Sequence, residues 1–174
     1  ATHPEDEWWP EIIESKQWPQ VERVEGGSTR QDSVLAALRA AGSSGLVAVH
    51  DSVRPYFRIE TLRRLLETVE EHGAAIPALP LRDTVHLVEG SEVRQTPDRS
   101  DYRAAQTPQC FRADILLEAM ERAVSEGHTG TDEAGIVARI GHPVRIIEGD
   151  EGNIKITTPE DLLLVEPFLK RDIG

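Results

Sequence analysis

The chain has 174 residues, 39% hydrophobic and 29% charged, which fits one ordinary globular domain with a buried core. No apolar run approaches the roughly 18–20 residues of a membrane span, and a net charge of −12 repels polyanions. We therefore expect neither a membrane nor a nucleic acid as partner. The single cysteine, Cys110, excludes an internal disulfide framework and an all-cysteine metal site, so a reducing cytoplasm is the simplest compartment.

Helices and strands are predicted to alternate along the first half of the chain. In chain order they are a helix over 4–16, a strand over 21–24, a helix from Ser28 to Gly42, a buried strand over 46–49, a helix over 58–72 and a buried strand over 74–79. This order predicts an α/β fold, in which a mostly parallel sheet is flanked by helices.

Residues 83–97 have a different pattern, because two short strand-like runs flank Glu89-Gly90-Ser91. The pattern predicts an antiparallel hairpin whose few apolar residues cannot form a core of their own. We expect it to project from a single domain over 1–174 and to pair with another subunit as a dimerisation arm. The remaining predicted elements are helices over 113–126 and 131–139, strands over 143–148 and 153–156, and a last helix that begins at Thr158.

Asp51 and Arg54 follow the predicted buried strand 46–49. The carboxyl ends of strands are where open α/β sheets bind ligands. Asp51 there could hold Mg²⁺ beside nucleotide phosphates, and Arg54 could bind a phosphate through its fork of N–H groups. A surface turn with an Asp–Arg salt bridge is the competing interpretation.

Two further segments have polar residues in unusual settings. Gly26-Gly27 joins a predicted strand to a helix N-terminus, where the backbone could approach a base or a phosphate, although an ordinary tight turn explains it as well. Lys155 interrupts an otherwise apolar and β-branched strand, so it either meets an anion or extends to solvent. Neither segment alone decides between these interpretations.

Taken together and in order, the motifs resemble the 2-C-methyl-D-erythritol 4-phosphate cytidylyltransferase family. The resemblance runs from about residue 20 to the end of the chain. The segments that carry it are 26–34, 49–55 (VHDSVRP), 81–84 (LRDT), 98–111 with AAQTPQCF, 131–134 (TDEA) and 153–162 (NIKITTPEDL).

The resemblance implies a nucleotidyltransferase that joins CTP to methylerythritol phosphate with Mg²⁺, as a homodimer in which the arm reaches the neighbouring site. The implied roles are cytidine binding for Gly27 and Ser33, metal and nucleotide binding for Asp51, and substrate binding for Arg54, Thr84, Arg99, Thr107 and Lys155. Among these, Lys155, Arg99 and Asp51 would be the catalytic residues. The implied chemistry is charge stabilisation, because the attacking phosphate is already an anion.

The chain departs from the family at its start, where nothing matches the first strand and the glycine-rich loop that holds the CTP triphosphate. We therefore expect the 174 residues to be part of a longer polypeptide and to be inactive alone. Two alternatives stay open: a ribitol 5-phosphate cytidylyltransferase, which shares most motifs, and a truncated module that only binds or dimerises.

Overall fold

The computed structural model describes residues 1–3, 5, 6, 8, 9, 11 and 21–171. The chain forms two compact units: unit 1 comprises Ala1–Val47 and Phe111–Pro143, and unit 2 comprises Ala48–Cys110 and Val144–Gly174. The single domain over 1–174 stays a prediction. Among the described residues, no helix has both the length and the apolar character that crossing a membrane requires.

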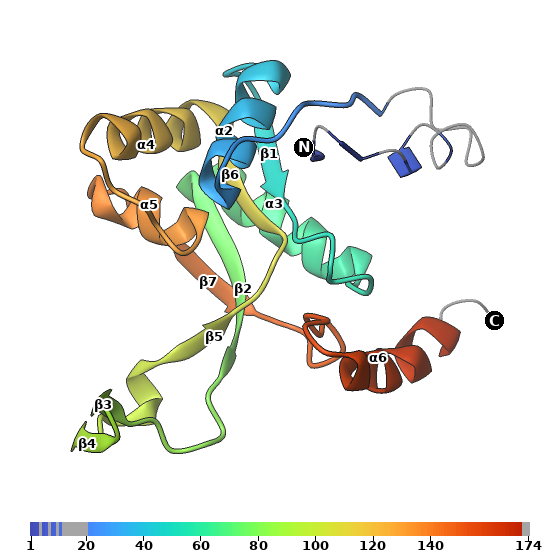
Figure 1. The fold of residues 1–174 in the computed structure, drawn as a ribbon. Coiled ribbons are helices and arrows are strands. Elements are labelled where there is room, and N and C mark those ends of the chain that lie inside the picture. The colour runs from blue at the N-terminus through green and yellow to red at the C-terminus, as the bar shows by residue number, and fades with distance from the viewer. Residues whose placement is uncertain (4, 7, 10, 12–20, 172–174) are drawn as a thin grey trace. The chain divides into compact units, whose positions relative to one another are not determined.

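Helices and strands alternate along the first part of the described chain, as far as residue 80, as Figure 1 shows. The helices are α2 (Arg30–Ala41), α3 (Ile59–His72), α4 (Ala113–Ser125), α5 (Glu133–Arg139) and α6 (Pro159–Arg171), with the 3-10 helix η1 (Arg99–Asp101). The strands are β1 (Leu46–Val49), β2 (Ala74–Pro80), β3 (Leu87–Glu89), β4 (Glu92–Gln95), β5 (Arg103–Ala105), β6 (Gln109–Arg112) and β7 (Arg145–Glu148).

Strand β2 is the centre of unit 2. It pairs in parallel with β7, from Ala75 opposite Arg145 to Ala78 opposite Glu148, and antiparallel with β5. Helix α3 packs against β2 and β7. The predicted α/β fold is confirmed, and β5 makes the sheet mixed.

The core of unit 2 follows from the spacing of apolar residues on α3. Leu65 and Val69 lie one turn apart on the same face, and both are fully buried together with Ala75 and Cys110. The helix ends at Gly73, whose φ of 83° lies in the left-handed region that favours glycine. Ile59, in the first turn of the helix, does not belong to this core, because 60% of its surface is exposed.

The predicted hairpin is confirmed as β3 and β4, which pair antiparallel around a turn at Gly90. In Figure 1 the hairpin lies beyond the ends of β2 and β5, on the side away from α3. Every residue of both strands is exposed. The hairpin therefore projects from unit 2, and its role as a dimerisation arm stays a prediction.

Unit 1 contains α2, α4 and α5, with α4 packed against the other two. Helix α2 begins with a capping box of Thr29 and Asp32, so its cap lies one residue after the predicted start at Ser28. Asp32 accepts the backbone N–H of Thr29 at 3.1 Å. The side-chain amide of Gln31 forms hydrogen bonds with the backbone of His128 and Gly130.

Three strand predictions need correction. Residues 21–24 form no strand, and only a single bridge joins Thr2 to Glu25. Strand β1 is half exposed rather than buried on both faces. Residues 153–156 form no strand, because this backbone bonds to the loop after β1, with the Ile156 N–H donating to the Val53 carbonyl at 2.9 Å. The predicted helix over 4–16 lies largely outside the described residues.

Candidate functional site

The loop after β1 places a carboxylate and a guanidinium side by side in unit 2. The backbone N–H of Arg54 donates to the Asp51 carbonyl at 3.0 Å, which closes the loop into a turn. The Asp51 N–H donates to the Thr107 Oγ1 at 3.0 Å, which ties the turn to the segment before β6. Both charged side chains are nearly buried, with 13% of Asp51 and 11% of Arg54 exposed.

Lys155 completes a charged cluster, defined here as Asp51, Arg54 and Lys155. The Asp51 Oδ2 lies 3.2 Å from the Lys155 Nζ and 3.6 Å from the Arg54 Nε. Burial lowers the pKa of Arg54, and the charge of Asp51 acts in the opposite direction. With two cations around one carboxylate, the cluster has a net positive charge, which suits an anionic ligand.

His50 connects the loop after β1 to Thr107, in the segment before β6. Its Nε2 lies 2.9 Å from the Arg54 carbonyl, which can only accept, so Nε2 carries a proton. In the neutral ring, Nδ1 is then an acceptor, and the Thr107 hydroxyl donates to it at 3.0 Å. The Thr107 hydroxyl thus accepts the backbone N–H of Asp51 and donates to the His50 Nδ1. These two hydrogen bonds fix the position of the Asp51 backbone.

Asn153 supports the cluster from the other side, a role that the sequence pattern did not predict. Its carbonyl accepts from the Arg54 Nη1 at 2.7 Å, and its side-chain Nδ2 donates to the Thr107 carbonyl at 2.7 Å. Only 1% of Asn153 is exposed. Two buried atoms, the Arg54 Nε and the Asn153 Oδ1, have no hydrogen-bond partner, so this region can still accept a polar ligand or water.

Asp51 is the one predicted metal ligand. No group of three or more His, Cys, Asp or Glu side chains among the described residues is arranged to hold a metal ion. A lone carboxylate still fits Mg²⁺, because that ion takes one or two carboxylates and fills its other positions with phosphate oxygens and water. Magnesium binding stays a prediction.

Thr84 and Arg99 lie near the base of the hairpin, and both are exposed. The Arg99 Nη1 donates to the Arg82 carbonyl. Within the described part of the chain, neither residue has a hydrogen bond or ion pair to the charged cluster. Hydrogen bonds and ion pairs of the described residues therefore join Asp51, Arg54, Thr107 and Lys155 and do not include Thr84 or Arg99 in this group.

The predicted cytidine-binding residues lie in unit 1. The Gly27 N–H donates to the Ser33 Oγ at 3.1 Å, and that hydroxyl donates to the Thr29 carbonyl at 2.9 Å. A Cβ on Gly27 would lie 2.3 Å from the Cβ of Asp32, so no other residue fits without a shift of the backbone. Ser33 thus holds the shape of the glycine turn.

A buried ion pair supports the same helix N-terminus. Arg30 binds Glu133 through two hydrogen bonds of 2.6 and 2.9 Å, and Glu133 is fully buried. The Gln31 amide donates to the His128 carbonyl and accepts from the Gly130 N–H. The segment 131–134 therefore has a structural role in unit 1, which its sequence alone did not indicate.

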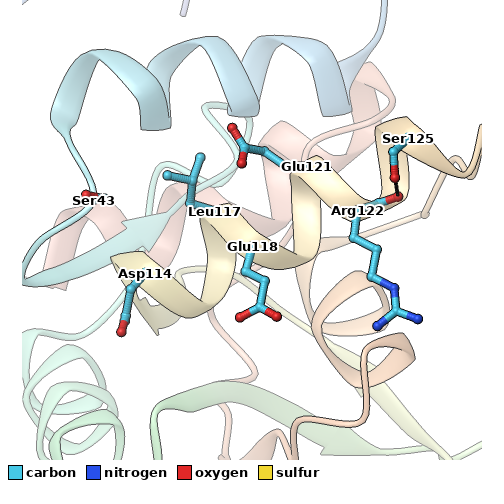
Figure 2. A pocket seen from close by; sticks show the side chains of 7 residues that line it. All are labelled: Ser43, Asp114, Leu117, Glu118, Glu121, Arg122 and Ser125. Atoms are coloured by element: carbon cyan, nitrogen blue, oxygen red, sulfur yellow. Dashed lines mark hydrogen bonds between the residues drawn. The ribbon is translucent and has the colours of Figure 1, made fainter.

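Each unit also has a pocket that these residues do not line. In unit 1, a pocket of about 580 Å³ lies along α4 and is lined by charged side chains that include Asp114, Glu118 and Arg122 (Figure 2). In unit 2, a pocket of about 630 Å³ includes Arg58 and Asp150. Neither pocket contains a predicted site residue.

Comparison with known proteins gives consistent matches. A model of the family "IspD: 2-C-methyl-D-erythritol 4-phosphate cytidylyltransferase" matches residues 1–171. The protein of that name from Geobacillus thermodenitrificans is 49% identical over 151 residues, which cover 87% of this chain and 66% of the relative. The relative from Symbiobacterium thermophilum is 46% identical over 157 residues. The chain thus spans slightly less than two thirds of the length of such relatives.

Solved structures agree. The crystal structure of 2-C-methyl-D-erythritol 4-phosphate cytidylyltransferase from Thermus thermophilus is similar, with a TM-score of 0.77 and 38% identity, over 87% of this chain and 78% of that one. The 4-diphosphocytidyl-2C-methyl-D-erythritol synthase from Anaerococcus prevotii has a TM-score of 0.85 and 29% identity, over 97% of this chain and 76% of that one.

Proposed function

We propose, on the premise that this chain belongs to the 2-C-methyl-D-erythritol 4-phosphate cytidylyltransferase family, that it transfers the cytidylyl group of CTP to methylerythritol phosphate. The observation that carries the proposal is the charged cluster, in which Lys155 and Arg54 lie 3.2 and 3.6 Å from the Asp51 Oδ2. Such a group of fixed charges is what a reaction between two polyanions requires.

In the proposed reaction, an oxygen of the methylerythritol phosphate attacks the α-phosphorus of CTP. A new P–O bond forms, the bond from the α-phosphorus to the oxygen that bridges to the β-phosphate breaks, and pyrophosphate leaves with that electron pair. The attacking oxygen is already anionic, so no general base is needed. The protein has to align the two substrates and stabilise the negative charge of the transition state.

Each predicted site residue has a part in this proposal. Lys155 and Arg99 hold the attacking phosphate, with Arg54 and Thr84 beside it, while Gly27 and Ser33 bind the cytidine. Thr107 already uses its only proton toward His50, so it suits a hydroxyl of the alcohol better than a phosphate oxygen. Mg²⁺, held by Asp51 and the triphosphate, would supply positive charge to the phosphates.

The arm has a part in the same proposal. We infer that β3 and β4 join two copies of the chain and that Thr84 and Arg99 act in the site of the neighbouring subunit. Both residues lie at the base of the projecting hairpin and are exposed, which supports this role. The compartment we propose is the cytoplasm, with which the free, buried Cys110 is consistent.

The proposal is tested by incubating the protein, as its gene encodes it, with CTP, Mg²⁺ and one alcohol phosphate at a time. We expect pyrophosphate release with methylerythritol phosphate, at a higher kcat/KM than with ribitol 5-phosphate. Preference for ribitol 5-phosphate would overturn the choice of substrate. No turnover by a correctly folded protein would favour a module that only binds or dimerises. The 174 residues alone, assayed in parallel, are expected to be inactive.

A further inference from the structure

The side-chain amide of Gln106 clamps a turn that the proposed function does not explain. Its Oε1 accepts the Asp150 N–H at 3.0 Å, and its Nε2 donates to the Asp150 carbonyl at 2.7 Å and the Asn153 carbonyl at 3.3 Å. The orientation of the amide is fixed by its partners, because an N–H can only donate and a carbonyl can only accept. Only 6% of Gln106 is exposed, so it acts from inside unit 2.

The clamped turn comprises residues 149–153 and is built around this amide. The Asp150 carboxylate accepts the Gly152 N–H at 2.8 Å and pairs with the Arg58 Nε at 2.6 Å. A Cβ on Gly149 would lie 2.4 Å from the Gln106 Oε1, so a side chain there would displace the amide. The turn is therefore shaped to receive Gln106.

Gln106 is itself anchored to the sheet. Gln106 is the residue directly after strand β5, and its backbone N–H donates to the carbonyl of Pro77 in β2 at 2.8 Å. The Gly149 N–H donates to the carbonyl of Ala78, the next residue of β2, at 3.0 Å. Through these two hydrogen bonds, strand β2 holds the turn 149–153 in place, although that turn has no regular secondary structure.

The clamp leads directly to the charged cluster. The Asn153 carbonyl that accepts from Gln106 also accepts from the Arg54 Nη1 at 2.7 Å. Two residues further along, Lys155 pairs with Asp51. A shift of Asn153 would therefore move the guanidinium of Arg54 and the ammonium of Lys155 together.

We propose that Gln106 is a positioning residue for the phosphate of the alcohol substrate, acting through Asn153 on Arg54 and Lys155. This inference rests on the proposed function, because it assigns Gln106 a part in the same site. In this role, Gln106 does not contact the substrate and contributes no charge. Its effect is to keep two cations at the separation that the attacking phosphate needs.

The substitution Gln106→Glu tests this role, because it keeps the size and replaces the Nε2 donor by oxygen. As a carboxylate, the new group would face the carbonyls of Asp150 and Asn153 and repel both. As a neutral carboxylic acid, it can donate to the Asp150 carbonyl and still accept the Asp150 N–H, as the amide does. The charged groups that contact the same turn are Asp150, which pairs with Arg58, and Arg54, which donates to the Asn153 carbonyl.

The expected result in the full protein, at neutral to alkaline pH, is a loss in kcat/KM for methylerythritol phosphate of about tenfold or more, the ratio for one hydrogen bond of ordinary net strength. The KM for this substrate should rise, while the KM for CTP changes little. On mild acidification, the activity of the variant relative to wild type should recover. A merely structural role would lower the fraction of folded enzyme, and with it kcat, without raising the KM for methylerythritol phosphate.

Gln31→Glu is the matched control, because Gln31 is a similarly buried amide clamp in unit 1, with 7% exposed. It should not change the KM for methylerythritol phosphate. If Gln106→Glu does not fold, Gln106→Met removes the clamp without a charge and should raise the same KM. Wild-type kinetics in the folded variant would overturn the inference, whereas an inactive wild type would overturn the proposed function instead.

Discussion

Arg54 uses two sides of its guanidinium on two different groups. Its Nη1 donates to the Asn153 carbonyl at 2.7 Å, and its Nε lies 3.6 Å from the Asp51 Oδ2. A lysine could not make both contacts, because an ammonium is a compact charge without the planar fork of arginine. Arg54 therefore holds the turn after β1 in addition to its proposed role toward phosphate.

The substitution Arg54→Lys is expected to lower the free energy of unfolding by about 1–3 kcal/mol, since a nearly buried charged hydrogen bond is lost. Chemical denaturation measures the change. Arg63→Lys is the control, because 64% of the Arg63 side chain is exposed, and a shift within about 0.5 kcal/mol is expected there. Equal losses for the two variants would show that the Arg54 fork contributes nothing specific.

At this scale, the sequence predicted the charged residues better than the polar ones that hold them. Asp51 and Arg54 were recognisable because charges follow an apolar strand, and Lys155 because it interrupts apolar residues. Gln106 and Asn153 were not, because an amide in a loop looks the same whether it is solvated or buried. Only the tertiary structure brings their hydrogen-bond partners to them.

At the scale of elements, local chemistry decided most boundaries. Helices α3 and α4 were predicted within about two residues, because their apolar periodicity and their ends are encoded locally. Strands β5 and β6 were missed, and the strand over 153–156 was wrong. Strand formation depends on which partner is adjacent in the folded chain, and the sequence of one segment does not contain that information.

The start of α6 shows how strongly a local signal can act. The Asp161 Oδ2 accepts from the backbone N–H groups of Thr157 and Thr158 at 2.8 and 2.9 Å. These hydrogen bonds, with that of Thr157 the largest cause, lower the pKa of Asp161 below its ordinary value of 3.8. The Asp161 carboxylate therefore stabilises the folded chain fully above the pKa that Asp161 has in the unfolded chain. This stabilisation is lost as the pH falls through the lower pKa of the folded state.

We predict that Asp161→Asn lowers the melting temperature at neutral pH and that its difference from wild type shrinks as the pH falls below about 4. Thermal unfolding over a pH series measures this. Glu160→Gln, in the same first turn, is the control for a general charge effect at the helix start. A difference for Asp161→Asn that stays constant on acidification would contradict the cap.

At the scale of the whole molecule, the arm is the part that packing within the chain does not explain. Leu87, Val88 and Val93 each expose 56–58% of their surface, on a hairpin in which every residue of both strands is exposed. Burying these side chains against a second copy would remove apolar area from water. The arm was predictable from its short strands and turn, because a hairpin is encoded locally, whereas its partner is not.

We predict a dimer in solution and a shift toward monomer on Val88→Asp, which places a charge in the proposed interface. Sedimentation equilibrium measures the mass. Val124→Asp on α4 is the control, because Val124 is similarly exposed, at 50%, and belongs to unit 1 rather than to the arm. An unchanged dimer mass for Val88→Asp, or a monomeric wild type, would rule out the arm as the interface.

The most direct measurement is the rate of pyrophosphate release from CTP and methylerythritol phosphate by the Lys155→Ala variant of the protein as its gene encodes it. If the charged cluster binds the attacking phosphate, this rate falls by about 10²-fold or more. Lys170→Ala, which removes an exposed lysine on α6, should leave the rate unchanged. Near-normal turnover by the Lys155→Ala variant would contradict the proposed site.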